Sequence, residues 1–302
     1  MPIFAMSKTL KLSADGKKLV KVLDKSAEQI TVPAGVEVIG YDAFADCKAL
    51  KSIEIPNSVE EIGVEAFWSC ESLQSIDIPN SVTEIGEGAF AWCTSLQCID
   101  IPNSVTEIEE RAFWRCKALK RVDIPKSVTT IGEGAFSDCS SLQSINVIDG
   151  NQHYASVDGV LYSKDLTIIK KVPGGAGLNS FSISDNVTTI EGWAFYDCHS
   201  LQSIHIPNSV TKIEGSAFYD CYSLQSIHIP NSVTKIGDWA FEGCSSLQSI
   251  HLHNTNLEEL DIDKYALVGV NMDECTLYVP AGTKEAYSNH PVLGKFKKIE
   301  EE

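Results

Sequence analysis

Histidines at a fixed interval are the residues of this 302-residue chain most suited to chemistry. His205, His228 and His251 follow one another at steps of 23 residues, and each comes directly after a Ser-Ile pair. If the repeat places these imidazoles side by side on neighbouring strands, they could bind a zinc or nickel ion together. They would also gain charge as the pH falls through about 6.5. Duplication of one segment explains the same spacing, so metal binding is the weaker alternative, and no metal or cofactor is expected.

Carboxylates hold the same repeat position earlier in the chain. Like charges directly opposite one another on adjacent strands cost stability. Such a run therefore either serves a partner or is compensated nearby, for which Arg121 is placed two residues before Asp123. Duplicated segments would also share these residues without any function. Together with the histidines they form one candidate binding face: Glu54, Asp77, Asp100, Arg121, Asp123, His205, His228 and His251.

A second candidate surface is aromatic. All five tryptophans lie on or beside a recurring Ala-Phe pair, at positions that vary between repeats, and two tyrosines join them. Tryptophan and tyrosine are favoured anchors in protein interfaces. The alternative is that these rings fill gaps between successive turns of the fold. The residues of this aromatic wall are Trp68, Trp92, Trp114, Trp193, Tyr196, Tyr219 and Trp239.

The cysteines do not indicate catalysis or zinc. Eight of the ten follow Ala-Phe after two residues, as in Ala89-Phe90-Ala91-Trp92-Cys93, and no C-x-x-C pair occurs. A cysteine at one place in every repeat is expected to stack inside the fold as a small apolar side chain. Cys98 is the exception that should face solvent, as an incidental thiol with no histidine beside it. No nucleophile elbow, phosphate loop or HExxH motif stands out, so we expect a non-enzyme.

One repeated stretch positions all of these residues. Residues 73–93, LQSIDIPNSVTEIGEGAFAWC, recur at 23-residue steps, and a period of that length predicts a solenoid. Within it, Leu73 to Ile78 is expected to form a strand that Pro79 ends. A short helical turn should follow from Glu87 to Trp92. The predicted fold is a right-handed α/β solenoid leaning to β, with a parallel sheet on one face and short helical turns on the other.

The consensus LxxIxIPxSVxxIGxxAFxxC closely resembles the repeat of the BspA-like leucine-rich repeat family of bacterial and protist proteins. The resemblance covers roughly residues 27 to 252. It implies a surface or secreted binding protein, some relatives of which bind host matrix proteins or other cells. We therefore expect an adhesin-like scaffold for a protein or glycan partner. An intracellular interaction module and a structural spacer remain alternatives.

The repeat also divides the chain. Residues 1–26 read as an N-terminal cap hairpin turning at Asp15-Gly16, residues 27–252 as the solenoid, and residues 253–302 as a degenerate repeat and cap. One repeat runs for 36 residues between Leu142 and Leu178. Its extra length, at about 148–177, predicts a hairpin around Lys164-Asp165 that leaves the rod, beside a binding face or as a spacer.

The composition of the chain limits the classes of partner that it could bind. A formal net charge of −17 disfavours nucleic acid, whose phosphates need lysine and arginine. It also favours solubility through repulsion between copies, and a monomer is expected. No apolar run is long enough to insert into a membrane, and the start, MPIFAMSKTLKLS, lacks the pattern of a signal peptide. The resemblance indicates the cell surface or secretion, with the cytoplasm as the alternative.

Overall fold

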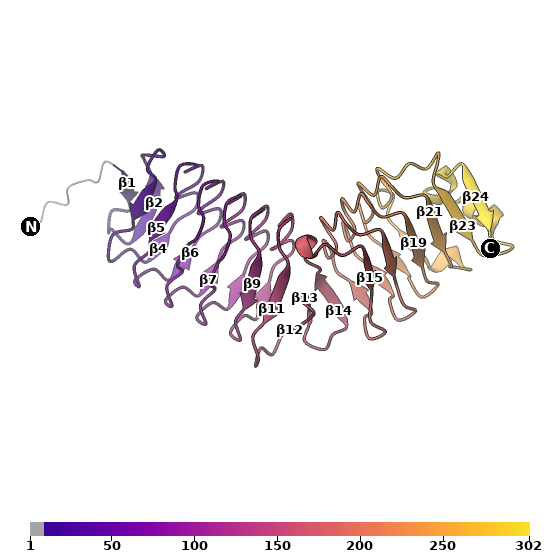
Figure 1. The fold of residues 1–302 in the computed structure, drawn as a ribbon, viewed down its shortest axis with the longest axis horizontal. Coiled ribbons are helices and arrows are strands. Elements are labelled where there is room, and N and C mark those ends of the chain that lie inside the picture. The colour runs from indigo at the N-terminus through magenta and orange to yellow at the C-terminus, as the bar shows by residue number, and fades with distance from the viewer. Residues whose placement is uncertain (1–8) are drawn as a thin grey trace, which may run out of the picture. The chain divides into compact units, whose positions relative to one another are not determined.

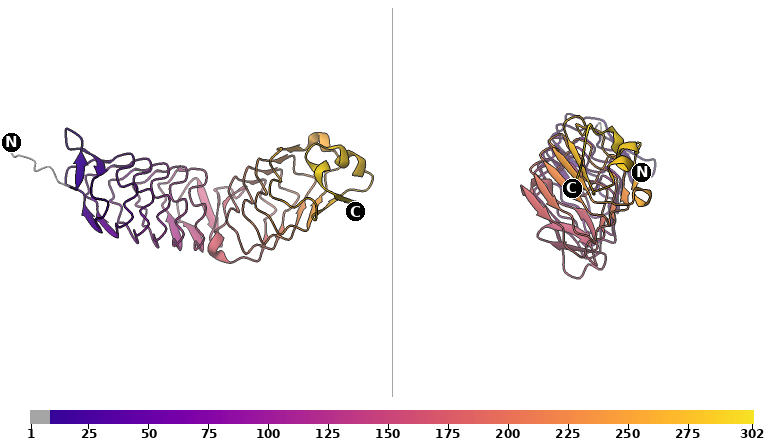
Figure 2. Two further views of the ribbon diagram at one scale, coloured as in Figure 1. Left: turned by 90° about the horizontal axis from the view of Figure 1, so that it is seen from above. Right: turned by 90° about the vertical axis from the view of Figure 1, so that its right-hand side faces the viewer.

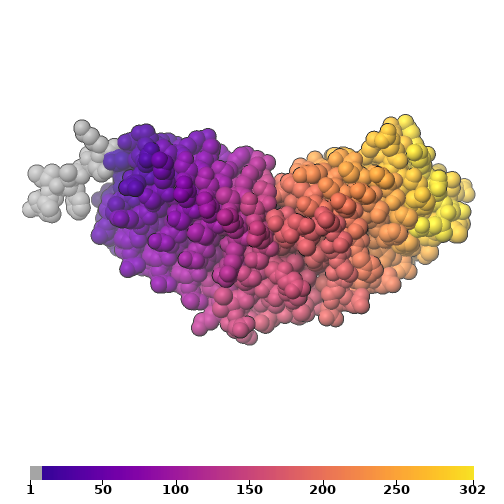
Figure 3. Space-filling view, in the orientation of Figure 1, coloured from indigo at the N-terminus to yellow at the C-terminus, as the bar shows by residue number. Residues whose placement is uncertain are grey.

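The computed structural model describes residues 9–302, so the first eight residues of the expected N-terminal cap lie outside the described part. The chain divides into two compact units, Met1–Ser156 and Val157–Glu302. Each unit is a stack of coils that run side by side (Figures 1 and 2). Within each unit the side chains of successive coils pack into a continuous surface (Figure 3). The predicted solenoid is therefore confirmed, with parallel sheets and very little helix.

In the first unit the strands form two columns. One column is a seven-stranded sheet whose first two strands are antiparallel and whose later neighbours are parallel. In sheet order these are β1 (Leu10–Leu12), β2 (Lys18–Val22), β4 (Val38–Ile39), β6 (Glu61–Ile62), β7 (Glu84–Ile85), β8 (Glu107–Ile108) and β10 (Thr130–Ile131). The second column holds two parallel pairs, β3 (Gln29–Thr31) with β5 (Ser52–Glu54), and β9 (Arg121–Ile124) with β11 (Ser144–Val147). β12 (Tyr154–Val157) leads the chain into the second unit.

The second unit repeats the two columns. Its first column runs in the order β13 (Val160–Ser163), β14 (Ile168–Lys171), β16 (Thr189–Ile190), β18 (Lys212–Ile213), β20 (Lys235–Ile236) and β22 (Asp261–Ile262). Its second column is a parallel six-stranded sheet of β15 (Ser180–Ser182), β17 (Ser203–His205), β19 (Ser226–Ile229), β21 (Ser249–Leu252), β23 (Thr276–Val279) and β24 (Lys298–Glu301). Helical segments are η1 (Gly174–Ala176), η2 (Leu257–Glu259), α1 (Lys284–Asn289) and η3 (Leu293–Lys295).

The expected helical turn from Glu87 to Trp92 is a stack of hydrogen-bonded turns instead. The N–H of Ala89 donates within its own turn, whereas the N–H of Phe90 donates to the carbonyl of Ala112 in the next repeat, at 2.8 Å. Alternate N–H groups thus point along the stack, which a helix does not allow. Trp92 adopts a left-handed φ of +64° to make this possible. The turns therefore form a third hydrogen-bonded wall.

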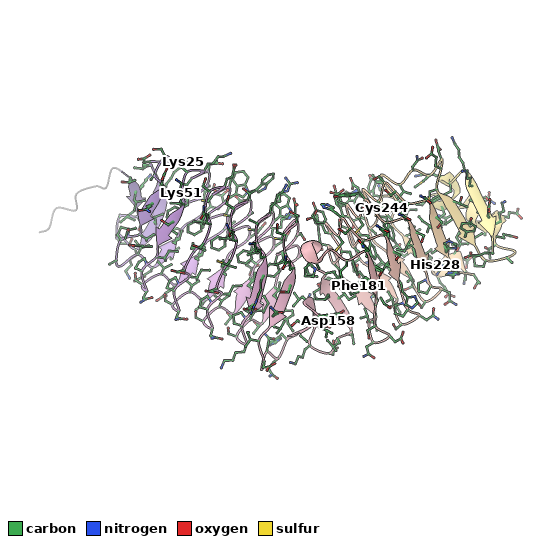
Figure 4. All side chains as sticks on the ribbon, viewed as in Figure 1. Lys25, Lys51, Asp158, Phe181, His228 and Cys244 are labelled. Carbon is green, nitrogen blue, oxygen red and sulfur yellow. The ribbon has the colours of Figure 1, made fainter. Side chains whose placement is uncertain are left out.

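The core consists of ladders, as the repeat predicts. Phe90 is fully buried and lies between Phe67 and Phe113, with ring centroids at 5.2 and 5.4 Å. The ladder cysteines are buried too, as Cys244 illustrates in Figure 4. They do more than fill space, because the thiol of Cys93 donates to the Phe67 carbonyl of the previous repeat at 3.2 Å. The same contact recurs from Cys70, Cys116, Cys139, Cys221 and Cys244.

The strand expected from Leu73 to Ile78 does not form. Both ends of the stretch are buried as predicted, but its pairing is a single bridge between Asp77 and Asp100. The apolar pattern thus places the inward side chains correctly, while the outward residues of this part of the first unit leave the ladder incomplete.

Each unit begins with the same hairpin. In the first, Ser13 Oγ donates to Asp15 at 2.6 Å and β1 pairs antiparallel with β2. In the second, Ser163 Oγ donates to Asp165 at 2.7 Å and β13 pairs antiparallel with β14. The sequence predicts that the inserted hairpin leaves the rod. This is wrong, because β14 continues into the sheet by pairing parallel with β16. Leu166, with φ +61°, takes the turn position that a glycine holds in the first unit.

Candidate binding surfaces

The acidic positions lie in one outward column of the first unit. Asp77 and Asp100 stand opposite each other and are exposed. Asp123 is compensated as the sequence indicated, because the Arg121 guanidinium donates to both of its carboxylate oxygens at 2.9 and 2.6 Å. The Arg121 contact holds the pKa of Asp123 below its usual range; burial acts in the opposite direction. In this column the charge of Asp123 is therefore neutralised by Arg121, whereas no basic side chain of residues 9–302 is seen to pair with Asp77 or Asp100.

At its other end the column receives a weaker contact. Thr31 Oγ1 donates to Glu54 Oε2 at 3.0 Å across the β3–β5 pair. A hydroxyl contributes one neutral hydrogen bond, which does not cancel a charge as a guanidinium does. Asp77 and Asp100 thus remain the part of this face most open to a cationic partner.

The histidines of the second unit stack on one another. His228 lies on the outward side of β19 (Figure 4), with its ring centroid 3.9 Å from that of His251 and an interplanar angle of 15°. His251 in turn stacks on Tyr278 at 4.5 Å. His228 Nδ1 lies 3.5 Å from His253 Nε2, and His251 Nδ1 lies 2.8 Å from Glu302 Oε2. This group of rings occupies the outward face of β19, β21 and β23.

Stacked imidazoles do not converge on a common point, as metal ligands must. His205 holds the same position on β17, one strand before His228. Among residues 9–302 no three histidine, cysteine or acidic side chains are grouped so that they could hold a metal ion. Burial first, and then the neighbouring His251 and His253, lower the pKa of His228. The geometry thus favours a surface whose charge depends on pH.

The aromatic wall is carried by the stacked turns and differs between the units. In the first unit, Trp68, Trp92 and Trp114 are half-buried. In the second, Tyr196 is buried and Trp193 is half-buried against it, with ring centroids 5.0 Å apart. Most of these rings are therefore packed between turns and partly exposed, and their use as an interface stays a prediction.

One pair on this wall is largely exposed. Trp239 is 42% exposed and stacks at 6.1 Å on Tyr265, which is 44% exposed. Tyr265 was not among the aromatic residues picked from the sequence, because the Ala-Phe pair that marks the wall becomes Ala266-Leu267 there. Its position relative to that pair, directly before the alanine, was the available signal.

An arginine on the wall was also missed. The Arg115 guanidinium carbon lies 4.1 Å from the Trp92 ring centroid and 5.0 Å from that of Trp114. The two indoles meet edge to face at 5.7 Å. Arg115 Nε also forms an ion pair with Asp138 at 2.5 Å. The aromatic wall of the first unit thus holds a cation between two π faces and beside a carboxylate.

The first unit has a second column of acidic residues, which the sequence analysis did not identify. Glu61, Glu84 and Glu107 stand opposite one another on β6, β7 and β8. Burial first, and then these neighbours and Glu109, raise the pKa of Glu84. The sequence does contain a signal for this column, at the residue before each Ile-Gly or Ile-Glu pair. That residue is Glu in these three repeats, whereas two repeats of the second unit have Lys212 and Lys235 there.

Nothing about the thiols indicates a nucleophile. Cys98 is exposed as expected, while the other nine cysteines are buried and free. A very small pocket in the second unit is lined by Cys198 and by apolar side chains, including Phe181 and Phe195. Burial raises the pKa of Cys198 to about 11, so this thiol stays protonated at neutral pH.

The repeats match one family model, the BspA type leucine rich repeat region, in 6 copies over residues 23–154 and 173–289. The chain belongs to this BspA-type family. The solenoid of this family is a repeat scaffold, and such scaffolds are typically not catalytic. None of the curated proteins compared with the chain matches it.

Solved structures of bacterial leucine-rich repeat proteins resemble this BspA-type chain. A leucine rich cell surface protein from Faecalibacterium prausnitzii is 26% identical, with a TM-score of 0.62 over 100% of this chain and 95% of that one. A leucine-rich repeat protein from Bacteroides ovatus is 26% identical, with a TM-score of 0.61 over 97% of this chain and 75% of that one. The pneumococcal vaccine antigen PcpA, at 23% identity, shares the fold with a TM-score of 0.71 over 97% and 82%. No helix in residues 9–302 has the length and apolar character to cross a membrane.

Proposed function

We propose that this BspA-type protein is a non-catalytic scaffold that binds a protein partner at a bacterial surface, in the manner of an adhesin. The observation that carries the proposal is the aromatic wall, where tryptophan and tyrosine rings keep exposed edges on a backbone tied together by hydrogen bonds between successive repeats. A surface that is rigid before binding loses little conformational entropy on docking. Tryptophan and tyrosine are the residues that most often anchor such contacts.

The outward column is the second surface that supports binding. Its acidic members in the first unit would attract a basic partner and raise the association rate more than the affinity. The relationship to a cell surface protein from Faecalibacterium prausnitzii favours a partner outside the cell, such as a host extracellular protein. An intracellular partner would satisfy the same two surfaces, so the test must include both sources.

The test compares variants of the two surfaces. Purified host extracellular proteins are passed over the immobilised chain, and binding is measured by surface plasmon resonance beside proteins of a bacterial lysate. One variant reverses the outward column (Asp77→Lys, Asp100→Lys); the other removes wall aromatics (Trp68→Ala, Trp193→Ala). We expect saturable binding of an extracellular protein that at least one variant abolishes while circular dichroism stays native. Binding that neither folded variant changes would contradict the proposed surfaces, and partners found in the lysate alone would contradict the surface location.

A further inference from the structure

The first unit shows how the aromatic wall binds a cation. Arg115 lies over the Trp92 ring, close to Trp114, and its ion pair with Asp138 completes the cage. The guanidinium is planar and weakly hydrated, so it stacks on an indole more readily than an ammonium does. Three conditions are met together here: a π face, a second ring, and a carboxylate within ion-pair distance.

The second unit carries an exposed pair of rings on its wall. Trp239 and Tyr265 stack with an interplanar angle of 19°. Asp238 directly precedes Trp239 and Glu242 follows it by three residues, so two acidic residues flank this tryptophan in the sequence. Lys264 Nζ already lies 4.6 Å from the Tyr265 ring centroid, so this ring contacts a cation from its own chain.

No arginine is present to fill this part of the wall. The residue before the ladder cysteine is Asp197, Asp220 or Gly243 in the second unit. In the first unit Arg115 holds one of five such positions, and the others are Asp46, Ser69, Trp92 and Asp138. Residues 157–302 contain ten lysines and no arginine. The wall of the second unit thus has no guanidinium of its own.

We propose that the Trp239–Tyr265 pair, with the acidic residues Asp238 and Glu242 close to Trp239 in the sequence, is the docking site for an arginine side chain of a basic segment in the partner protein. The inference rests on the proposed function and names the partner chemistry for one part of the aromatic wall. A net charge of −17 steers such a segment toward the chain. The arginine stacks on the exposed rings while a carboxylate pairs with its charge, as Asp138 does with that of Arg115.

The probe is a synthetic peptide with three Arg-Gly-Ser units, compared with Lys-Gly-Ser and Glu-Gly-Ser peptides of the same length. Binding to the full chain is followed by isothermal titration calorimetry at 50 and 300 mM NaCl. We expect the arginine peptide to bind more tightly than the lysine peptide, and the glutamate peptide not to bind. Trp239→Ala and Tyr265→Ala should each weaken arginine-peptide binding about 3- to 30-fold, the range expected for losing a cation–π contact.

Tyr222→Ala is the matched control, because Tyr222 is 46% exposed in the same unit but stacks on His199. Its binding should equal that of the unchanged chain. Equal affinity for arginine and lysine peptides, or equal loss in the Tyr222→Ala variant, would overturn the proposal. Binding of a neutral oligosaccharide or a proline-rich peptide that depends on Trp239, without arginine-peptide binding, would overturn it in favour of another occupant.

The same variants separate this inference from the proposed function. If a Trp239→Ala, Tyr265→Ala double variant keeps full capture of an extracellular protein, the scaffold function stands and the arginine site is wrong. If the arginine peptide binds through these rings but no extracellular protein is captured, the site stands and the proposed function is wrong.

Discussion

The two units share one sequence repeat, but the column of strands that carries the outward residues is interrupted in the first unit and continuous in the second. In the first unit the column breaks between β5 and β9, where an isolated bridge between Asp77 and Asp100 is the pairing that remains. In the second, six strands from β15 to β24 pair without interruption, and His228, His251 and Tyr278 stack along them. The inward residues do not differ in kind, since Ile76 and Ile227 are both buried. The difference therefore lies in the outward side chains.

Repulsion between carboxylates does not explain the break alone. Glu61, Glu84 and Glu107 also face one another in the first unit, and their sheet stays paired. What the second unit adds is attraction, because offset or stacked rings contribute beyond the area they bury. The comparison teaches that the inward pattern specifies the coil, whereas the outward residues determine how much regular sheet forms on it.

The largest effect tests whether the cores of the units are equivalent. Phe90→Ala in the first unit and Phe218→Ala in the second each remove a fully buried ring from a stacked ladder. Each should lower the free energy of unfolding of its unit by about 3–5 kcal/mol, because the cavity is only partly refilled. Urea unfolding followed by circular dichroism measures this, with exposed Tyr41→Ala as the control. A loss near zero in either variant would mean that the ladder does not stabilise that unit.

This core is also the part that the sequence predicts best. A fixed period and an apolar residue type are sufficient to place Phe90 and Cys93 inside. The thiol hydrogen bond of Cys93 is not accessible to such reasoning, because its acceptor lies 26 residues away and depends on the register of neighbouring coils. The left-handed backbone at Trp92 is equally hidden, since helix and turn share the same short apolar pattern.

The sequence predicts which strands or turns carry the residues of the candidate surfaces, but not the contacts that their side chains make. The sequence places His228 and His251 on one column, and the register of β19 and β21 agrees. It does not reveal that Glu302, 51 residues after His251, reaches the same group. Arg115 illustrates the same limit, because its role depends on Trp92 in the previous coil rather than on any neighbour in the chain.

The next effect separates repulsion from attraction in the outward column. Asp77→Asn with Asp100→Asn removes the facing charges and should raise the free energy of unfolding of the first unit by about 0.2–1 kcal/mol. Asp77→His with Asp100→His transfers residues of the second unit and should add a further stacking gain at pH 7.5. Both are measured by urea unfolding against Asp149→Asn, an exposed acidic position outside the column. Equal gains from the asparagine and histidine pairs would show that repulsion is the whole difference.

The smallest effect concerns protonation of the histidine stack. The pKa of His228 is lowered by burial and by His251 and His253, while Glu302 opposes the shift and His205 adds to it slightly. Because the folded state binds this proton less readily than the unfolded state, the contribution to stability is present above pH 6.5 and is lost as the pH falls below it. The effect is small because His228 is exposed on one side and water screens its neighbours.

His228→Asn should therefore reduce the loss of unfolding free energy between pH 7.5 and pH 5 relative to the unchanged chain. The measurement is urea unfolding of the second unit at both pH values. His153→Asn, an exposed histidine of the first unit, serves as the control because carboxylates titrate equally in all three proteins. If His228→Asn and the unchanged chain lose stability in parallel, protonation of the stack does not couple to folding. The histidine column would then differ from the acidic column in the attraction between its rings alone.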